Sequence, residues 1–142
     1  MKLLDVNVVL AAHRADHPDH TTARPWLDDL LASGGQFGVP WTVWWSFLRL
    51  SSHPRVFRLP TPLTDAVSFI SALRAQPGHI RVEPGEAHVD CLRTVCTSGE
   101  AAADLVPDAV LAALATEHGA EVVSFDRDFA RFPQLRWSRP ER

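Results

Sequence analysis

Three aspartates occur where apolar segments of the sequence end, and together their carboxylates could bind a divalent metal ion. Asp5 lies in the apolar run Met1–Leu10, Asp108 near the start of an apolar helical segment, and Asp126 directly after the apolar segment Glu121–Phe125. Carboxylates held close together repel one another and raise each other's pKa unless a cation neutralises them. Mg²⁺ needs only one or two carboxylates and keeps most of its waters. We therefore expect Mg²⁺, with Mn²⁺ as a substitute, and no nearby Cys or His indicates zinc.

The positions of these acids follow from the elements that the sequence predicts around them. The run Met1–Leu10 predicts a strand buried on both faces, as in a parallel sheet covered by helices. A short helix from Val8 to Ala15 follows, with Asn7 placed either to cap it or to orient Asp5. In a doubly wound sheet, strand C-termini and helix N-termini share one edge. Asp5, Asp108 and Asp126 should therefore meet there.

The C-terminal third contains the clearest helix and the next strand. Between Asp104 and Gly119 the apolar residues recur every three to four positions, Pro107 fits the first helical position and Gly119 fits the position just after the helix. Glu121–Phe125 predicts the following strand, and Leu135–Trp137 a short terminal one.

The remaining segments alternate between helical and strand patterns, which predicts an α/β fold. Thr42 and Thr64 are the expected caps of two of the helices. The expected helices are Thr21–Ala32, Val43–Leu50, Asp65–Ala75 and Glu86–Ser98, and the expected strands are Gln36–Val39 and Ile80–Val82. We predict one domain over residues 1–142, an α/β/α sandwich with a mostly parallel central sheet.

Composition sets outer limits on function. The chain has 142 residues, of which 46% are hydrophobic and 22% are charged, as expected for a single globular domain. A net charge of −3 argues against nucleic-acid binding through a broad positively charged surface, but it does not exclude binding through a local group of basic residues. The N-terminus has no signal-peptide pattern, and no apolar stretch approaches the ~18 residues of a membrane span. Cys91 and Cys96 are typical of reduced thiols, so we expect a cytoplasmic protein.

Two further groups of side chains each have two interpretations. His13, His17 and His20 have metal-ligand spacing on a helix, but Pro18 interrupts that helix, so a polar loop with capping histidines is favoured. Arg55 and Arg58 lie in the loop 51–62 and either contact phosphates or are simply solvated.

The helix that begins near residue 43 is apolar on nearly every side. Trp41, Trp44 and Trp45 fall close together on it. A helix of this kind is either deeply buried or covers a partner. Because Trp is a preferred residue at protein interfaces, we favour a subunit interface over core packing alone.

Three sequence segments, taken together, resemble a known family. These are Leu-Leu-Asp-Val-Asn-Val at residues 3–8, Leu-Val-Pro-Asp-Ala at 105–109 and Val-Val-Ser-Phe-Asp-Arg-Asp-Phe-Ala-Arg-Phe-Pro at 122–133. They resemble the PIN domain ribonucleases, and most of all the VapC toxins of bacterial type II toxin–antitoxin pairs. The resemblance implies a PIN-like fold and a Mg²⁺-dependent ribonuclease that hydrolyses RNA. It also implies a homodimer and a VapB-like antitoxin whose tail covers the active site. The pair would bind promoter DNA only through that antitoxin.

By the same resemblance, Asp5 and Asp108 would be the principal metal ligands and catalytic residues, and Asp126 the late acid of the cluster. Asp104 would be an auxiliary acid, and Ser124 stands where the family often has Ser or Thr.

One position departs from the family pattern. The family usually carries a Glu on the helix after the second strand, whereas this chain has Ser46-Phe47-Leu48-Arg49, and no Asp or Glu occurs between Leu30 and Thr64. Either Asp104 substitutes, or one metal ion suffices, or the metal site is weak. Arginines such as Arg49, Arg55 and Arg58 are candidates to hold phosphates that flank the cleaved bond.

Three alternatives were weighed against this interpretation. A response-regulator receiver and a haloacid-dehalogenase-like phosphatase both need a lysine late in the chain, and the only lysine is Lys2. The stronger alternative is a degenerate PIN fold that binds RNA or a protein partner without cleavage, which the missing Glu favours.

Overall fold

A parallel sheet of four short strands forms the centre of the protein. The computed structural model describes residues 1–141. The strands are β1 (Lys2–Leu4), β2 (Phe37–Gly38), β3 (Glu121–Val123) and β4 (Trp137–Ser138). Their order across the sheet is β2-β1-β3-β4, and each neighbouring pair is parallel. From β1 the chain crosses to β2 on one side of β1 and later returns to β3 on the other side. The carboxyl ends of β1 and β3 therefore form the topological switch point, where open α/β sheets bind ligands.

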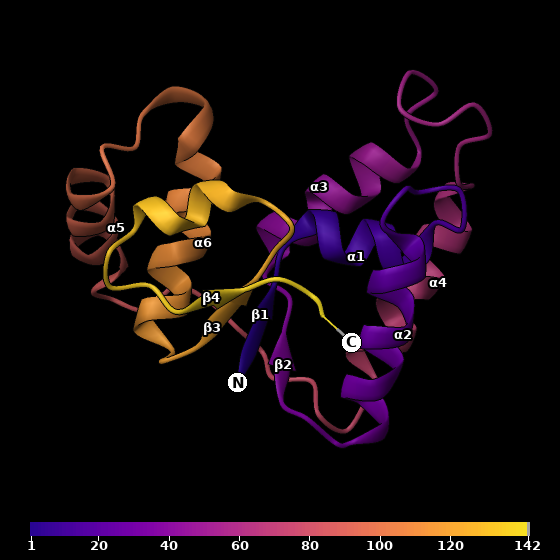
Figure 1. Ribbon diagram of the computed structural model, residues 1–142, viewed down its shortest axis with the longest axis horizontal. Helices are drawn as coiled ribbons and strands as arrows, with labels where there is room; N and C mark the ends of the chain where they lie inside the picture. Colours follow the sequence, from indigo (N-terminus) through magenta and orange to yellow (C-terminus); the bar gives the residue numbers. More distant parts are fainter. Residues whose placement is uncertain (142) are drawn as a thin grey trace.

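Helices cover both faces of this sheet. In Figure 1 the sheet lies between α5 and α6 on one side and α1, α2 and α4 on the other. The helices are α1 (Val6–His13), α2 (His20–Ala32), α3 (Trp41–Ser51), α4 (Leu63–Arg74), α5 (His88–Ser98) and α6 (Val106–Glu117), with 3₁₀ turns η1 (Ala103–Leu105) and η2 (Arg127–Arg131). The α/β/α sandwich with a parallel sheet is therefore confirmed.

The two central strands are buried on both faces, as a parallel sheet between helix layers requires. Leu3 and Leu4 of β1 and Val122 and Val123 of β3 have no exposed surface. Burying a side chain of this size contributes about 1.5–3 kcal/mol, so these strands hold the switch point rigidly in place.

The first strand is much shorter than predicted. It ends at Leu4, and α1 begins at Val6, because Asp5 itself caps the helix: its carboxylate accepts a hydrogen bond from the Val6 N–H at 2.6 Å. The backbone carbonyl of Asp5 accepts from the N–H groups of Val8 and Val9, each at 3.2 Å. A continuous apolar run does not distinguish a buried strand from a buried helix, and here it contains both.

Other predicted boundaries also shift. The predicted strand Ile80–Val82 is wrong, because only His79 forms a bridge with Phe37, and Pro84 and Gly85 lie shortly beyond. The predicted threonine caps are wrong as well, since α3 and α4 begin one residue after prolines, at Pro40 and Pro62. Proline fixes φ near the value that a helix entry needs.

The C-terminal helix is close to its prediction. α6 starts at Val106, with Pro107 in its first turn, and Gly119 follows its end with φ of 59°. That left-handed conformation is one that glycine adopts without strain.

No helix within residues 1–141 is long and apolar enough to cross a membrane.

Candidate metal centre

A network of hydrogen bonds joins the ends of β1 and β3 at the switch point. Ser124 is fully buried, and its hydroxyl donates to Asp5 Oδ2 at 2.6 Å. Asn7 donates from Nδ2 to the same Asp5 oxygen at 3.0 Å and to Ser124 Oγ at 2.9 Å. The side-chain oxygen of Asn7, Oδ1, accepts a hydrogen bond from the Phe125 N–H at 3.1 Å. Ser124 Oγ accepts a hydrogen bond from the Asp126 N–H at 2.9 Å. The prediction that Asn7 orients Asp5 is therefore confirmed, and its predicted alternative role as a cap is not found.

Asp5 is the most enclosed acid of this edge, with 8% of its surface exposed. Burial raises the pKa of Asp5, hydrogen bonds from Ser124, Val6 and Asn7 act against that rise, and the charge of Asp126 adds to it. A buried carboxylate held by three donors has a fixed orientation.

Three other carboxylates lie beside it. Asp108 in the first turn of α6, and Asp126 and Asp128 at the start of η2, each offer an oxygen within 4.8 Å of the others. Asp126 caps η2 by accepting a hydrogen bond from the Asp128 N–H at 2.8 Å. Asp5 is not part of this closest group within residues 1–141, although its charge acts on Asp108.

The pKa of Asp108 shows how strongly these acids interact. It is raised to about 6, first by partial burial and then by the charges of Asp5, Asp126 and Asp128, while Arg131 acts in the opposite direction. A carboxyl group with this pKa is an unfavourable place for one more negative charge and a favourable place for a cation.

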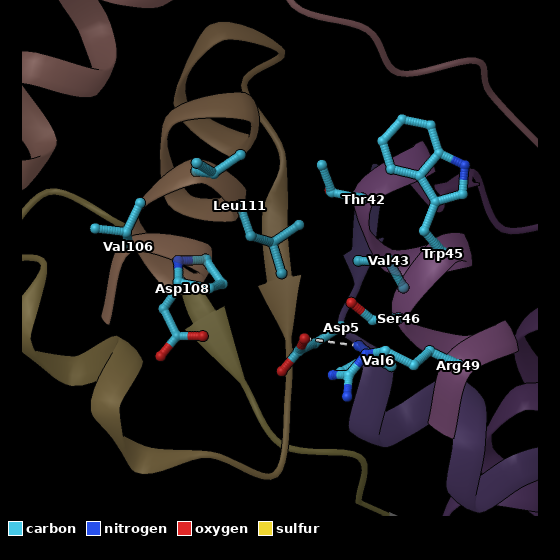
Figure 2. Close-up of a pocket in the computed structure, with 12 residues that line it drawn as sticks. Asp5, Val6, Thr42, Val43, Trp45, Ser46, Arg49, Val106, Asp108 and Leu111 are labelled. Carbon is cyan, nitrogen blue, oxygen red and sulfur yellow. Dashed lines mark hydrogen bonds between the residues drawn. The ribbon is translucent and has the colours of Figure 1, made fainter. Parts of the chain in front are cut away.

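A cavity of about 460 Å³ opens directly in front of Asp5 and Asp108. One wall comes from α6 and the other from α3, and Figure 2 shows the two carboxylates between the helices. The residues that line it are mostly apolar: Asp5, Val6, Thr42, Val43, Trp45, Ser46, Arg49, Val106, Pro107, Asp108, Val110 and Leu111. Its volume is in the range of ligand sites.

The structure thus brings Asp5, Asp108 and Asp126 to one edge, as the sequence predicts, and adds Asp128. Asp128 was missed as a candidate ligand because an Asp-Arg-Asp sequence after a strand is also an ordinary turn. Its spacing of two residues from Asp126 was the available signal. Asp104 lies exposed in η1, outside the group of close carboxylates found in residues 1–141.

The histidines have separate partners. His13 contacts Thr61 Oγ1 at 3.3 Å, His17 accepts the Asp19 N–H at 3.1 Å, and His20 contacts the Ala11 carbonyl at 2.8 Å. The predicted polar loop is correct only for His17, because His13 ends α1 and His20 begins α2, and the described residues place no metal group there.

The loop arginines lie apart from the cavity. Arg55 and Arg58 are exposed between α3 and α4, and neither lines it.

The donor set fits a hard divalent cation. Carboxylate oxygens are the ligands that Mg²⁺ and Mn²⁺ prefer. Partial burial raises the pKa of Asp108 most, and the charges of Asp5, Asp126 and Asp128 raise it further. Asp108, Asp126 and Asp128 would hold such an ion, and the charge of Asp5 acts on Asp108 beside them.

Comparison with known proteins identifies the family. The family model described as PIN domain matches residues 2–135, nearly the whole chain. The chain belongs to the PIN domain family. Among curated PIN proteins it is 54% identical over 140 residues to "Ribonuclease VapC25" of Mycobacterium tuberculosis, with 99% of each chain covered. The predicted resemblance to the VapC branch is confirmed.

Solved structures of PIN proteins share the fold at low identity. The VapBC2 structure of Rickettsia felis, bound to a promoter DNA fragment, matches with a TM-score of 0.71 at 15% identity, covering 99% of this chain and 98% of that one. Mycobacterium tuberculosis VapC20, described as a Sarcin-Ricin loop cleaving toxin, matches with a TM-score of 0.64 at 18% identity, covering 92% and 93%. Across these low identities, the arrangement of sheet and helices is retained.

Proposed function

We propose that this chain is a Mg²⁺-dependent endoribonuclease that acts as the toxin of a VapBC-type toxin–antitoxin pair. The observation that carries the proposal is the meeting of Asp108, Asp126 and Asp128 beside Asp5 at the switch point of a PIN fold. The name of the 54% identical relative, a ribonuclease, supports RNA as the substrate.

The chain's own residues have clear tasks in such a reaction. When bound, Mg²⁺ or Mn²⁺ supplies the Lewis acidity that phosphodiester hydrolysis needs. Asp5, Asp108 and Asp126 would hold the cation together with Asp128, and Ser124 and Asn7 keep the Asp5 carboxylate in one orientation. Val106, Pro107, Val110 and Leu111 of α6 give the cavity an apolar wall beside the acids. An acidic protein can then act on an acidic polymer, because the cation reverses the local field.

Cleavage of RNA by the purified chain tests this proposal. Total bacterial RNA is incubated with Mg²⁺, with Mn²⁺ and with EDTA, new 5′ ends are mapped, and Asp5→Ala is run alongside. We expect discrete cuts that need the metal and vanish in the variant. Metal-independent cuts, or equal cuts by the variant, would contradict it.

A degenerate PIN fold remains the second candidate, and the specific observation in its favour is the acid-free α3 wall, where Ser46 lines the cavity. Asp108→Ala separates the two functions when growth inhibition by the expressed chain is measured. Loss of inhibition with retained folding supports catalysis, and unchanged inhibition supports sequestration.

The partners follow from the same proposal. We propose a cytoplasmic homodimer that binds a VapB-like antitoxin and meets DNA only through it. The Rickettsia felis VapBC2 structure, which contains promoter DNA, supports such an assembly. Co-expression with a candidate VapB-like antitoxin, followed by light scattering of the purified complex, checks both the stoichiometry and the dimer.

A further inference from the structure

One face of α3 forms the cavity wall that carries no acid. Thr42, Trp45, Ser46 and Arg49 all line the cavity. They follow one another at intervals of three, one and three residues, so they form a single stripe along the helix. The opposite face of the same helix is buried: Trp44 is only 1% exposed. The stripe is therefore the side of α3 that the fold leaves uncovered.

Trp45 presents a large aromatic surface at this wall. Trp45 is 62% exposed, whereas Trp44 is 1% exposed. Its ring centroid lies 6.5 Å from that of Trp41, with 31° between the ring planes. In Figure 2 the indole lies farther from the two carboxylates than Arg49 does.

Arg49 supplies a positive charge at the same wall. Within residues 1–141 its guanidinium forms no ion pair, which it shares with other arginines such as Arg55 and Arg58, but those two do not line the cavity. Figure 2 shows the Arg49 side chain pointing from α3 toward Asp5. The charged groups that line the cavity are thus Asp5 and Asp108 at one side and Arg49 at the other.

Trp45 and Arg49 are four residues apart on a helix, which makes them neighbours about 5–6 Å apart at Cβ. A flat aromatic surface beside a cation suits a nucleotide, which has a flat base and an anionic phosphate. Bases stack on aromatic side chains only when they are not paired within a duplex. Arginine binds phosphate oxygens through two parallel N–H donors.

We propose that the α3 stripe binds one unpaired nucleotide of the RNA substrate, with its base stacked on Trp45 and a phosphate held by Arg49. The neighbouring phosphodiester then lies toward Asp5 and Asp108. This inference rests on the proposed function, and it adds which residues of this chain contact the base and the phosphate. The combination of a lone cation with an exposed indole favours RNA over an apolar protein segment, which needs no cation.

Binding of short labelled RNA without cleavage tests the stripe. Fluorescence anisotropy in EDTA compares single-stranded RNA with a duplex of the same sequence, for the wild type, Trp45→Ala, Trp45→Phe and Arg49→Ala. Two substitutions serve as matched controls, with thermal melts to verify folding. Trp41→Ala removes an exposed Trp of α3 that does not line the cavity, and Arg93→Ala removes an exposed arginine of α5.

We expect Trp45→Ala to weaken single-strand binding by about 5-fold to 100-fold, as loss of one stacked base does, and Trp45→Phe to retain most of it. Arg49→Ala should weaken binding and reduce the slope of log K against log salt by about 0.7, the value for one phosphate contact on a single strand. The two controls should bind like the wild type. In Mg²⁺, the KM of Trp45→Ala should rise while kcat changes little.

Several results would overturn the inference: equal binding by Trp45→Ala and the wild type, equal binding of duplex and single strand, or no binding of single-stranded RNA by the wild type. So would a loss confined to antitoxin binding, which would assign the stripe to a protein partner. Failure of the proposed function looks different, because Trp45-dependent RNA binding would persist in a chain that cuts nothing with Mg²⁺ or Mn²⁺.

Discussion

The two walls of the cavity differ in charge and in how they are built. The sheet edge and the start of α6 contribute Asp5 and Asp108 to the cavity, with Asp126 and Asp128 next to Asp108, whereas α3 contributes no acid and one arginine, Arg49. Topology alone creates the first wall, because parallel strand ends and helix starts meet there. The second wall depends on which residues one helix leaves uncovered. Our two proposals place metal binding at the first wall and substrate binding at the second.

The largest effect is expected from Asp108→Asn, which keeps the shape of the side chain and removes its charge. Removing a side chain that only hydrogen-bonds to a metal ligand typically lowers metal affinity or activity by about 10–100-fold. Loss of a ligand itself should therefore lower the rate of RNA cleavage by more than about 100-fold. Rates of cleavage of a defined RNA at saturating Mg²⁺ measure it. Asp104→Asn is the control, because Asp104 lies exposed in η1. Equal losses in both variants would mean that the cluster is wrongly assigned.

Ser124→Ala should have the next largest effect, because it removes the hydroxyl that donates to Asp5 and accepts from the Asp126 N–H. We expect metal affinity to fall by roughly 10-fold to 100-fold, as when an outer-shell partner is lost. The free energy of unfolding should fall by about 1–3 kcal/mol, since a buried carboxylate loses a donor. Calorimetric titration with Mn²⁺ and urea unfolding check the two quantities. Ser124→Thr keeps the hydroxyl and should restore affinity, and no rescue would argue against this positioning role.

Adding an acid to the second wall would blur the difference between the walls. In Ser46→Glu a carboxylate faces the cavity that Asp5 and Asp108 line. Because a further negative charge raises neighbouring pKa values and attracts cations, we expect metal affinity at pH 7.5 to rise by a few-fold, about 1 kcal/mol or less. Ser46→Gln is the neutral control of matched size. A gain shared by both variants would show that charge is not the cause.

The smallest effect concerns the pH dependence of stability without metal. The pKa of Asp108 is about 6 in the folded protein, above its ordinary value of 3.8. Between about pH 4 and pH 6 the folded state therefore binds more protons than the unfolded state, and the stability contributed by this group falls as pH rises. After allowance for solvent screening, we expect a loss of about 1 kcal/mol.

The free energy of unfolding is measured with urea, in EDTA, at pH 4.5 and pH 7. Its change with pH in the wild type is compared with that in Asp108→Asn, which has no carboxyl group at this position to titrate. Saturating Mg²⁺ should remove most of the difference by stabilising the charged form. A wild type that gains stability relative to the variant between these pH values would contradict the assignment.

The sequence was most informative where local signals and topology agree. Pro107 and Gly119 mark α6 closely, and placing Asp5, Asp108 and Asp126 on one edge needed only the rule that parallel strands end together. Asp5 was harder to place, because it directly follows a strand of only three residues and also caps the next helix. Periodicity does not reveal such a change inside one apolar run.

The second wall could be predicted less well. The sequence showed that Trp41, Trp44 and Trp45 lie close together, and the structure separates them: Trp44 is buried in the core, while Trp41 and Trp45 are 41% and 62% exposed. Which face of an all-apolar helix is covered depends on tertiary packing, and helical spacing does not determine it. The interface interpretation stays a prediction for Trp41 and Trp45, at Trp45 it competes with the RNA contact proposed above, and Trp44 belongs to the core.

The most direct test of the division between the two walls is Mn²⁺ binding, measured by electron paramagnetic resonance on the wild type, Asp108→Asn and Arg49→Ala. We predict that Arg49→Ala binds Mn²⁺ at least as tightly as the wild type, because the substitution removes a positive charge that points toward Asp5 (Figure 2), and that Asp108→Asn loses the site. Equal binding by Asp108→Asn, or no binding by the folded wild type, would contradict a metal centre at the acidic edge.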